Sequence, residues 1–308
     1  MSTVSTSAFY DSAIFNMSRL RQSTNALQEQ ISTGDKLTNA SDDPLAAAQM
    51  RQFQAADTLS TADTANTNAA KTKLTLTDNT LTQFSNIVDS IQTLAAQAAS
   101  STLNDSQRQA IGTQIGAYYQ NLISLANTKD ATGNPLFGGQ GTGLAYTTDA
   151  SGNTSYTGTT SASTLSLGPG LSVTTGVTGP DFLTFTSNGT SKDLLSTVKS
   201  LAATLQASSS STSTAAVSAA NSALGDLTAG LDAITTSQTV VGARLNWVTT
   251  TTDMQTQISA QRATQEANVG GTDITTAAAM LSQQMTVLQA SQASFTKLAS
   301  LSLFSMLT

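Results

Sequence analysis

The chain contains 308 residues, of which 10% are charged and 5% aromatic, and it carries a formal net charge of −6. A chain of this length accommodates about two domains. Because large side chains are scarce, the composition favours long packed helices over a thick globular core. The negative charge and the lack of a Lys/Arg cluster exclude binding to nucleic acid through its phosphates.

Histidine and cysteine are absent from the chain. The commonest general base, the thiol nucleophile and the usual zinc ligands are therefore missing, and we expect no catalytic, cofactor or metal site. No apolar run approaches the ~18–20 residues that span a bilayer. The first ten residues lack the pattern of a secretory signal, so we expect export, if any, by a route without a cleaved signal peptide.

The N-terminal region predicts an amphipathic helix over Ser12–Thr33, which ends at Gly34. A helix of this kind cannot bury its apolar stripe alone and needs a partner. The residues of this stripe that we predict to form an assembly interface are Ile14, Met17, Leu20, Leu27 and Ile31.

A second helix is predicted to open at Ser41-Asp42-Asp43-Pro44. Asp43 can cap free backbone N–H groups, and Pro44 suits the first helical turn. Asp42-Asp43 is the only adjacent carboxylate pair, and its place at a helix start favours capping over acid–base chemistry. The long helix that follows keeps a heptad phase at Leu74, Leu81, Phe84, Val88, Ile91, Ala95 and Ala98. Asn104 and Gln107 then resemble a capping box that opens a third helix.

The character of the chain changes from about residue 128. Short β-type runs, separated by Gly, Pro and Asn turn signals, predict a small inserted all-β domain over residues 131–190. Gly138–Gly143 is read as a loop because no Lys-Ser/Thr pair follows it. Asp130, Thr132 and Asn134 are read as a turn, since a calcium loop would need an acidic residue where Gly141 stands.

Helical patterns resume over about 191–269, in stretches that include 214–236 and 239–268, and break at Gly270-Gly271. Trp247, the only tryptophan, is predicted to be a core or interface anchor. Arg244 and Arg262 are expected to face solvent or to pair with acidic residues. The last helix shows the four-three spacing of a heptad seam, formed by Ile274, Ala278, Leu281, Met285, Leu288, Gln292 and Phe295. Of these residues, we predict the following as interface residues: Ile274, Leu281, Met285, Leu288 and Phe295.

Several motifs resemble the bacterial flagellin superfamily, in particular its hook-associated, hook–filament junction members. Residues 30–44, which contain Ser41, Asp42, Asp43 and Pro44, are similar to the N-terminal signature of the family. Residues 130–139, which contain Leu136, Phe137 and Gly138, look like the segment that introduces the variable domain. Residues 241–246, with Arg244 and Asn246, resemble the start of the returning core helix, and residues 281–304 also match. The insert itself shows no specific match, and the ending at residues 305–308 departs from the junction pattern.

The resemblance implies a mainly α protein, an elongated flagellin-like helical bundle whose N- and C-terminal helices pair as a coiled coil. Residues 1–43 with 270–308 would form the terminal inner-core layer, 44–130 with 191–269 the helical bundle core, and 131–190 an outward-projecting β domain. The implied function is that of a structural junction protein between the hook and the flagellin filament, located in the extracellular flagellum. The implied partners are further copies of the chain, hook-associated protein 1, flagellin and an export chaperone of the flagellar type III apparatus. Two alternatives stay open at this point: a filament-forming flagellin, and an adhesin or saccharide-binding protein that uses the insert.

Overall fold

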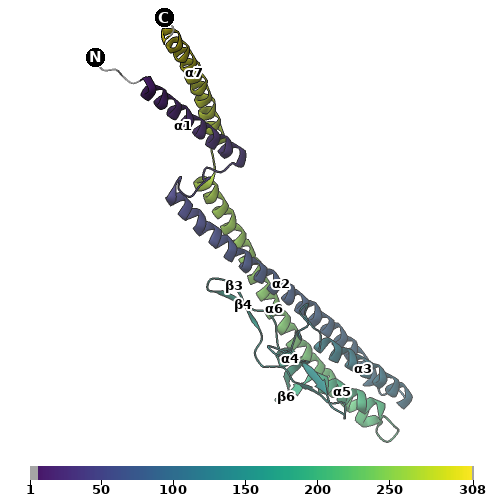
Figure 1. The fold of residues 1–308 in the computed structure, drawn as a ribbon. Helices are drawn as coiled ribbons and strands as arrows, with labels where there is room; N and C mark the ends of the chain where they lie inside the picture. The colour runs from purple at the N-terminus through teal and green to yellow at the C-terminus, as the bar shows by residue number, and fades with distance from the viewer. Residues whose placement is uncertain (1–5, 307–308) are drawn as a thin grey trace. The chain divides into compact units, whose positions relative to one another are not determined.

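The computed structural model describes residues 6–306 and is mainly α-helical, as the sequence predicts (Figure 1). Three two-stranded antiparallel sheets and one short helix lie between the longer helices. The helices are α1 Thr6–Thr33, α2 Pro44–Ala98, α3 Asp105–Ala126, α4 Gly179–Leu183, α5 Leu194–Gln206, α6 Ser213–Gly270 and α7 Ile274–Met306. None of the described helices is long and apolar enough to cross a membrane.

The chain divides into two compact units. The first comprises residues 1–59 and 256–308, and the second residues 60–255. Helices α2 and α6 contribute residues to both units. The three-part division that we expect from the sequence stays a prediction.

Local signals that the sequence carries account for the helix starts. Asp43 Oδ1 accepts a hydrogen bond of 3.0 Å from the backbone N–H of Ala46, which caps α2, and Pro44 occupies its first position. At α3, the Asn104 side chain accepts from the Gln107 N–H, and the Gln107 side chain accepts from the Asn104 N–H. Because these bonds satisfy orphan N–H groups, both helices begin where their capping residues place them.

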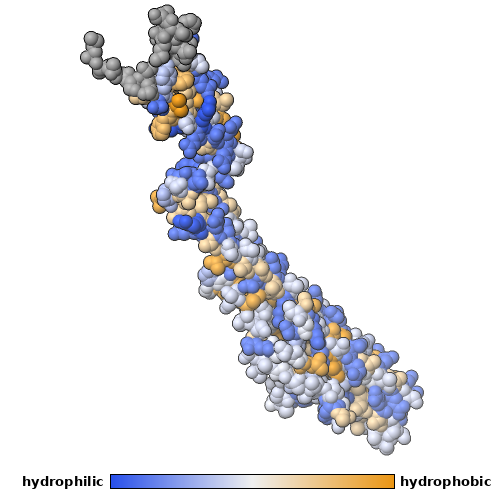
Figure 2. Space-filling view, viewed as in Figure 1, coloured by the Kyte–Doolittle hydropathy of each residue, from blue (hydrophilic) through white to orange (hydrophobic). Residues whose placement is uncertain are grey.

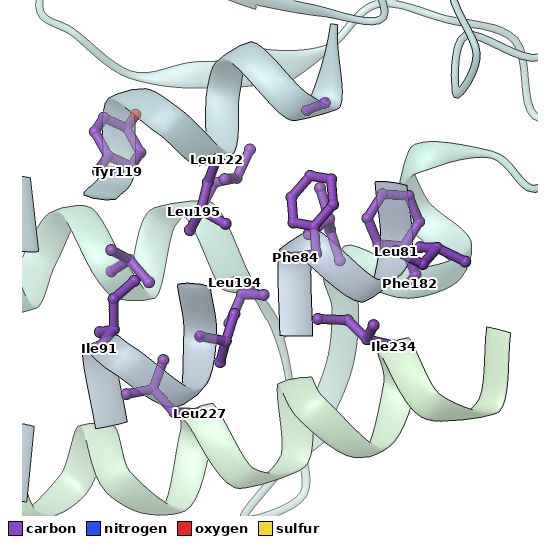
Figure 3. Close-up of a cluster of buried hydrophobic side chains, with 14 of the residues drawn as sticks. Leu81, Phe84, Ile91, Tyr119, Leu122, Phe182, Leu194, Leu195, Leu227 and Ile234 are labelled. Carbon is purple, nitrogen blue, oxygen red and sulfur yellow. The ribbon is translucent and has the colours of Figure 1, made fainter. Parts of the chain in front are cut away.

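The core of the 60–255 unit contains the predicted heptad stripe of α2, whose seven members are fully buried. The rings of Phe84, Phe137 and Phe182 pack against one another, with centroid separations of 4.7–6.1 Å. Figure 3 shows Phe84 and Phe182 together with leucines of α3, α5 and α6 around them. A single apolar cluster therefore joins the helices and the inserted segment.

The inserted segment forms three separate hairpins. Strands β1 Tyr146–Thr148 and β2 Thr154–Tyr156 pair, as do β3 Thr164–Gly168 with β4 Leu171–Thr174, and β5 Thr184–Ser187 with β6 Thr190–Asp193. The segment is not purely β, because α4 stands where the sequence suggests the start of a strand.

The hairpins are bound to the helices of the same unit rather than standing apart from them. Asn127 of the α3 terminus donates to the Tyr146 carbonyl and accepts from the Tyr146 N–H, both at 2.9 Å. Gln255 donates to the Leu167 carbonyl at 2.6 Å. Phe185, Leu167 and Tyr146 are at most 7% exposed within the common core. The inserted segment is thus part of the core of the 60–255 unit.

Candidate assembly surfaces

The terminal helices α1 and α7 lie antiparallel in the first unit and contact each other along one side. At one end, the Lys36 N–H donates to the Gly270 carbonyl (2.7 Å) and the Thr272 N–H donates to the Gly34 carbonyl (2.8 Å). At the other end, the rings of Tyr10 and Phe295 meet edge to face with centroids 5.4 Å apart. The predicted pairing of the two ends is therefore present in a single chain.

The side of α7 that faces α1 follows a heptad phase that the sequence only partly predicts. Half-buried or buried residues recur with the spacing four, three, four, three, four at Ala277, Leu281, Gln284, Leu288, Ser291 and Phe295. On α1 the half-buried predicted residues are Met17, Leu20, Leu27 and Ile31. The structure thus brings seven of the ten predicted interface residues to this seam: these four with Leu281, Leu288 and Phe295.

The other three predicted residues point away from the seam. Ile14 is 53% exposed, Ile274 55% and Met285 44%. The seam contains Ala277 and Gln284, whereas the sequence spacing suggested Ala278 and Met285. Both choices fit a heptad, because two overlapping heptad rows on α7 have Leu281, Leu288 and Phe295 in common. Sequence spacing alone does not distinguish two such rows.

Large apolar side chains remain exposed on the terminal helices, and on α7 they lie on both flanks of the seam. Besides the three residues just named, the side chains of Phe15, Met280 and Val287 are exposed. Figure 2 shows hydrophobic residues among hydrophilic ones on the visible face of this helix pair. Large apolar side chains exposed in this number on one helix pair mark an interaction site in a soluble protein. The six residues of this terminal apolar surface are Ile14, Phe15, Ile274, Met280, Met285 and Val287.

The loop before α2 is held by Asp42. Its carboxylate accepts hydrogen bonds from the Asn39 N–H (2.9 Å) and the Thr38 hydroxyl (3.0 Å), and these bonds lower the pKa of Asp42. Asp43 caps α2, whereas Ser41 and Pro44 are exposed. Both adjacent carboxylates therefore accept hydrogen bonds from nearby backbone N–H groups. Among the described residues, no group of His, Cys, Asp or Glu side chains is arranged to hold a metal ion.

The signature residues at the start of the insert have a packing role. Leu136 is 2% exposed and Phe137 is fully buried against Phe84 and Phe182. A Cβ added at Gly138 would lie 2.5 Å from a side-chain carbon of Pro135, so a larger residue there would force the loop to shift.

The arginines of α6 take different partners. Arg244 Nη1 donates to the Gly176 carbonyl at 2.5 Å, and partial burial lowers its pKa, while Asn246 is exposed. Arg262 forms an ion pair with Asp57 of α2, which agrees with the expectation that it pairs with an acidic residue. The hydrogen bond from Arg262 lowers the pKa of Asp57. Trp247 is 45% exposed, which excludes a core role and leaves the predicted interface role.

Arg108 is a structural residue that the sequence reasoning missed. Its side chain is 4% exposed, and its guanidinium donates to the carbonyls of Ala98 (3.4 Å) and Ser100 (3.0 Å), beside Asp105. Ala98 is the last residue of α2, where helical C=O groups lack intrahelical partners, and Ser100 follows it in the connection to α3. A cation near a helix C-terminus is a general signal that could have indicated this role.

Comparison with known proteins places the fold and its surfaces in context. The family model of the bacterial flagellin N-terminal helical region matches residues 4–142. The flagellar hook-associated protein 3 of Escherichia coli (strain K12) is 27% identical over 288 residues, which cover 90% of each chain. The chain is therefore similar to bacterial flagellin in its N-terminal helical region and to a hook-associated protein 3 over most of its length. The hook-associated protein 3 of Salmonella typhimurium is 29% identical over 149 residues, which cover 48% of this chain and 47% of that protein.

Solved structures of hook-associated proteins share the fold. A flagellar hook-associated protein-3 from Legionella pneumophila has a TM-score of 0.65 at 16% identity and covers 71% of this chain and 98% of its own. A hook-associated protein described as putative, from Vibrio parahaemolyticus, has a TM-score of 0.64 at 19% identity, with coverages of 75% and 100%. The relatives of this chain are thus flagellar components, and its fold is that of hook-associated protein 3.

Proposed function

We propose that the chain is a structural component of the bacterial flagellum that joins the hook to the flagellin filament. The observation that carries this proposal is the match to a hook-associated protein 3 over 90% of both chains, since it spans the terminal helices as well as the central unit. A match confined to the N-terminal helical region would favour a flagellin equally. No constellation of described residues favours a catalytic role.

Assembly is proposed to proceed through the terminal helices. In one chain, the α1–α7 pair covers only one side of each helix and leaves the terminal apolar surface exposed. Removing this surface from water is favourable by about 25 cal/mol per Å² of apolar area. Neighbouring copies that bring their own terminal helices together would bury it. Of the ten predicted interface residues, seven would then hold the α1–α7 pair of each copy, and Ile14, Ile274 and Met285 would contact the neighbour.

The proposed location is the extracellular flagellum, reached through the flagellar type III apparatus without a cleaved signal peptide. The proposed partners are other copies of the chain, hook-associated protein 1 on the hook side, flagellin on the filament side, and an export chaperone. Such a chaperone would cover the apolar rows of α7 before export. These details rest on the family resemblance and on the exposed residues of α1 and α7.

Immunogold labelling of intact flagella tests the position of the chain. An epitope tag inserted at the exposed Gly189 turn of the β5–β6 hairpin should be labelled at a single place between hook and filament. Labelling along the whole filament would instead identify a filament-forming flagellin, and labelling away from flagella would favour a surface adhesin.

A pair of matched variants tests the assembly route. Leu288 lies half-buried at the α1–α7 seam, whereas Thr286 is exposed on the far side of α7. Leu288→Asp should abolish attachment of filaments to hooks, because a carboxylate there must lose its hydration in the packed layer. Thr286→Asp carries the same charge and should retain attachment. Equal behaviour of the two variants would contradict the proposed route.

A further inference from the structure

Helix α7 carries two overlapping heptad rows, and the row that faces α1 is the more polar of the two. The facing row contains Gln284 and Ser291, whereas the row beside it contains Met285 at the level of Gln284. Met285 and Ile274 of the second row are 44% and 55% exposed. The Gln284 row comprises Ala277, Leu281, Gln284, Leu288, Ser291 and Phe295, and the Met285 row comprises Ile274, Ala278, Leu281, Met285, Leu288, Gln292 and Phe295.

The Gln284 side chain fits this seam poorly. Its Oε1 atom is buried and accepts no hydrogen bond from the described part of the chain. The contacts at the two ends of the helix pair place Gln284 level with the turn of α1 between Leu20 and Thr24. Thr24, the buried polar residue of α1, donates its hydroxyl to the Leu20 carbonyl at 2.8 Å and is satisfied within its own helix. A buried acceptor without a donor lowers stability, whereas an exposed acceptor is hydrated.

The α1 side of the seam accepts either row of α7. Its buried and half-buried residues recur with the spacing three, four, three, four, three, four, and they are mostly apolar. They are Tyr10, Ala13, Met17, Leu20, Thr24, Leu27 and Ile31. The centres of the two rows lie half a residue step apart, so a rotation of α7 by roughly 50° about its own axis exchanges them. Gly270-Gly271 lie just before α7, and glycines accommodate such a change in backbone angles.

We infer that α7 turns between two states against α1. In the presenting state, which the structure shows, Gln284 lies in the seam while Met285 and Ile274 face outward. In the hidden state, Met285 lies in the seam and Gln284 faces water. The hidden state satisfies the Oε1 atom and buries a large apolar side chain, so it is favoured in an isolated copy.

The turn controls how much of the terminal apolar surface an isolated copy exposes. In the hidden state, Met285 is withdrawn from water, which reduces the surface available for unwanted association. Neighbours that contact Met285 shift the balance to the presenting state, because a ligand favours the state that it binds. This use of the turn in assembly rests on the proposed function, whereas the turn itself is a property of a single copy.

Oxidation of methionine by hydrogen peroxide distinguishes the two states in a verified monomer. The chain has no cysteine, so peroxide oxidises methionine sulfur to the sulfoxide and is itself reduced to water. Met285 and Met280 are 44% and 50% exposed, so a fixed presenting state gives them similar rates. The hidden state covers Met285 and moves Met280 further from the seam. We therefore expect mass spectrometry to show Met285 oxidised several-fold more slowly than Met280.

A pair of leucine variants tests whether Gln284 drives the turn. Gln284→Leu removes the buried acceptor and should bring the oxidation rates of Met280 and Met285 together, because the presenting state is then favoured. Thr286→Leu places the same side chain at an exposed position of α7 and should leave the difference between the two rates unchanged. Leucine is a good helix former, so circular dichroism of both variants should match that of the unaltered chain.

The outcomes separate this inference from the proposed function. Equal oxidation of Met280 and Met285 in the unaltered monomer would overturn the inference, because α7 would then stay in the presenting state. A difference in rate that Gln284→Leu does not reduce would also overturn it, since the buried acceptor would not drive the turn. Neither result depends on flagella, and loss of the junction role itself would show as labelling elsewhere than between hook and filament.

Discussion

Phe182 tests whether the inserted segment is part of the core of the 60–255 unit. Its side chain comes from α4 inside the insert, is fully buried, and lies 5.1 Å from the ring of Phe84 on α2 and 4.7 Å from the ring of Phe137. Phe182→Ala removes the ring and leaves a cavity between two helices and the insert. Such a truncation costs about 3–5 kcal/mol of unfolding free energy, a range that includes the aromatic pair contacts.

The assay is thermal unfolding followed by helical circular dichroism. For a unit of this size, a loss of 1 kcal/mol lowers Tm by roughly 2–4 °C. We therefore expect Phe182→Ala to lower the Tm of the main helical transition by about 6–20 °C. Thr160→Ala, at an exposed position of the same insert, should leave it unchanged.

The result that would refute this reasoning is a helical transition that Phe182→Ala does not move. In that case the insert would be an independent domain, as the sequence patterns suggest, and the apolar cluster across α2, α4 and α6 would contribute nothing to helix stability.

Three further predictions concern other parts of the chain. Arg108→Met should destabilise the 60–255 unit by about 1–3 kcal/mol in urea unfolding, because the carbonyls of Ala98 and Ser100 lose their donor; an unchanged midpoint would contradict this. The pKa of Asp42 is lower in the folded chain than in the unfolded chain. The stabilisation that its carboxylate gives the loop is therefore complete above the unfolded pKa and is lost as the pH falls through the folded pKa. The protection of the Asn39 amide relative to its intrinsic exchange rate at each pH should therefore fall at acid pH, and Asp42→Asn should remove most of that pH dependence. In a verified monomer, the amides of α1 and α7 should exchange faster than those of α2 between residues 70 and 98, since the terminal seam is only half-buried; equal protection would indicate a stable closed pair.

Much of the helical architecture could be predicted from local signals. The heptad stripe of α2 and the capping box at Asn104 depend on residues close in sequence, and both are confirmed. The sequence patterns separated 214–236 from 239–268, whereas α6 is one helix over Ser213–Gly270. Gln238 and Thr239 are compatible with a helix, and the buried neighbours Ser237 and Val241 hold this stretch against the core.

Contacts between distant segments could not be read from the sequence in the same way. The insert carries turn and strand signals, yet its docking depends on Asn127 and Gln255, which lie outside it and whose side-chain partners have no local pattern. On α7, the choice of the row that faces α1 depends on the register of the pair, fixed by the contacts near Gly34 and Gly270. Spacing identifies the candidate rows, and the partner helix selects between them.

The most direct measurement of the central claim is filament attachment in a strain that lacks the gene for this chain. If the chain joins hook and filament, the mutant cells should carry hooks without filaments and release flagellin into the medium, and expression of the chain from a plasmid should restore attached filaments. Filaments that remain attached to hooks in the mutant would contradict the account.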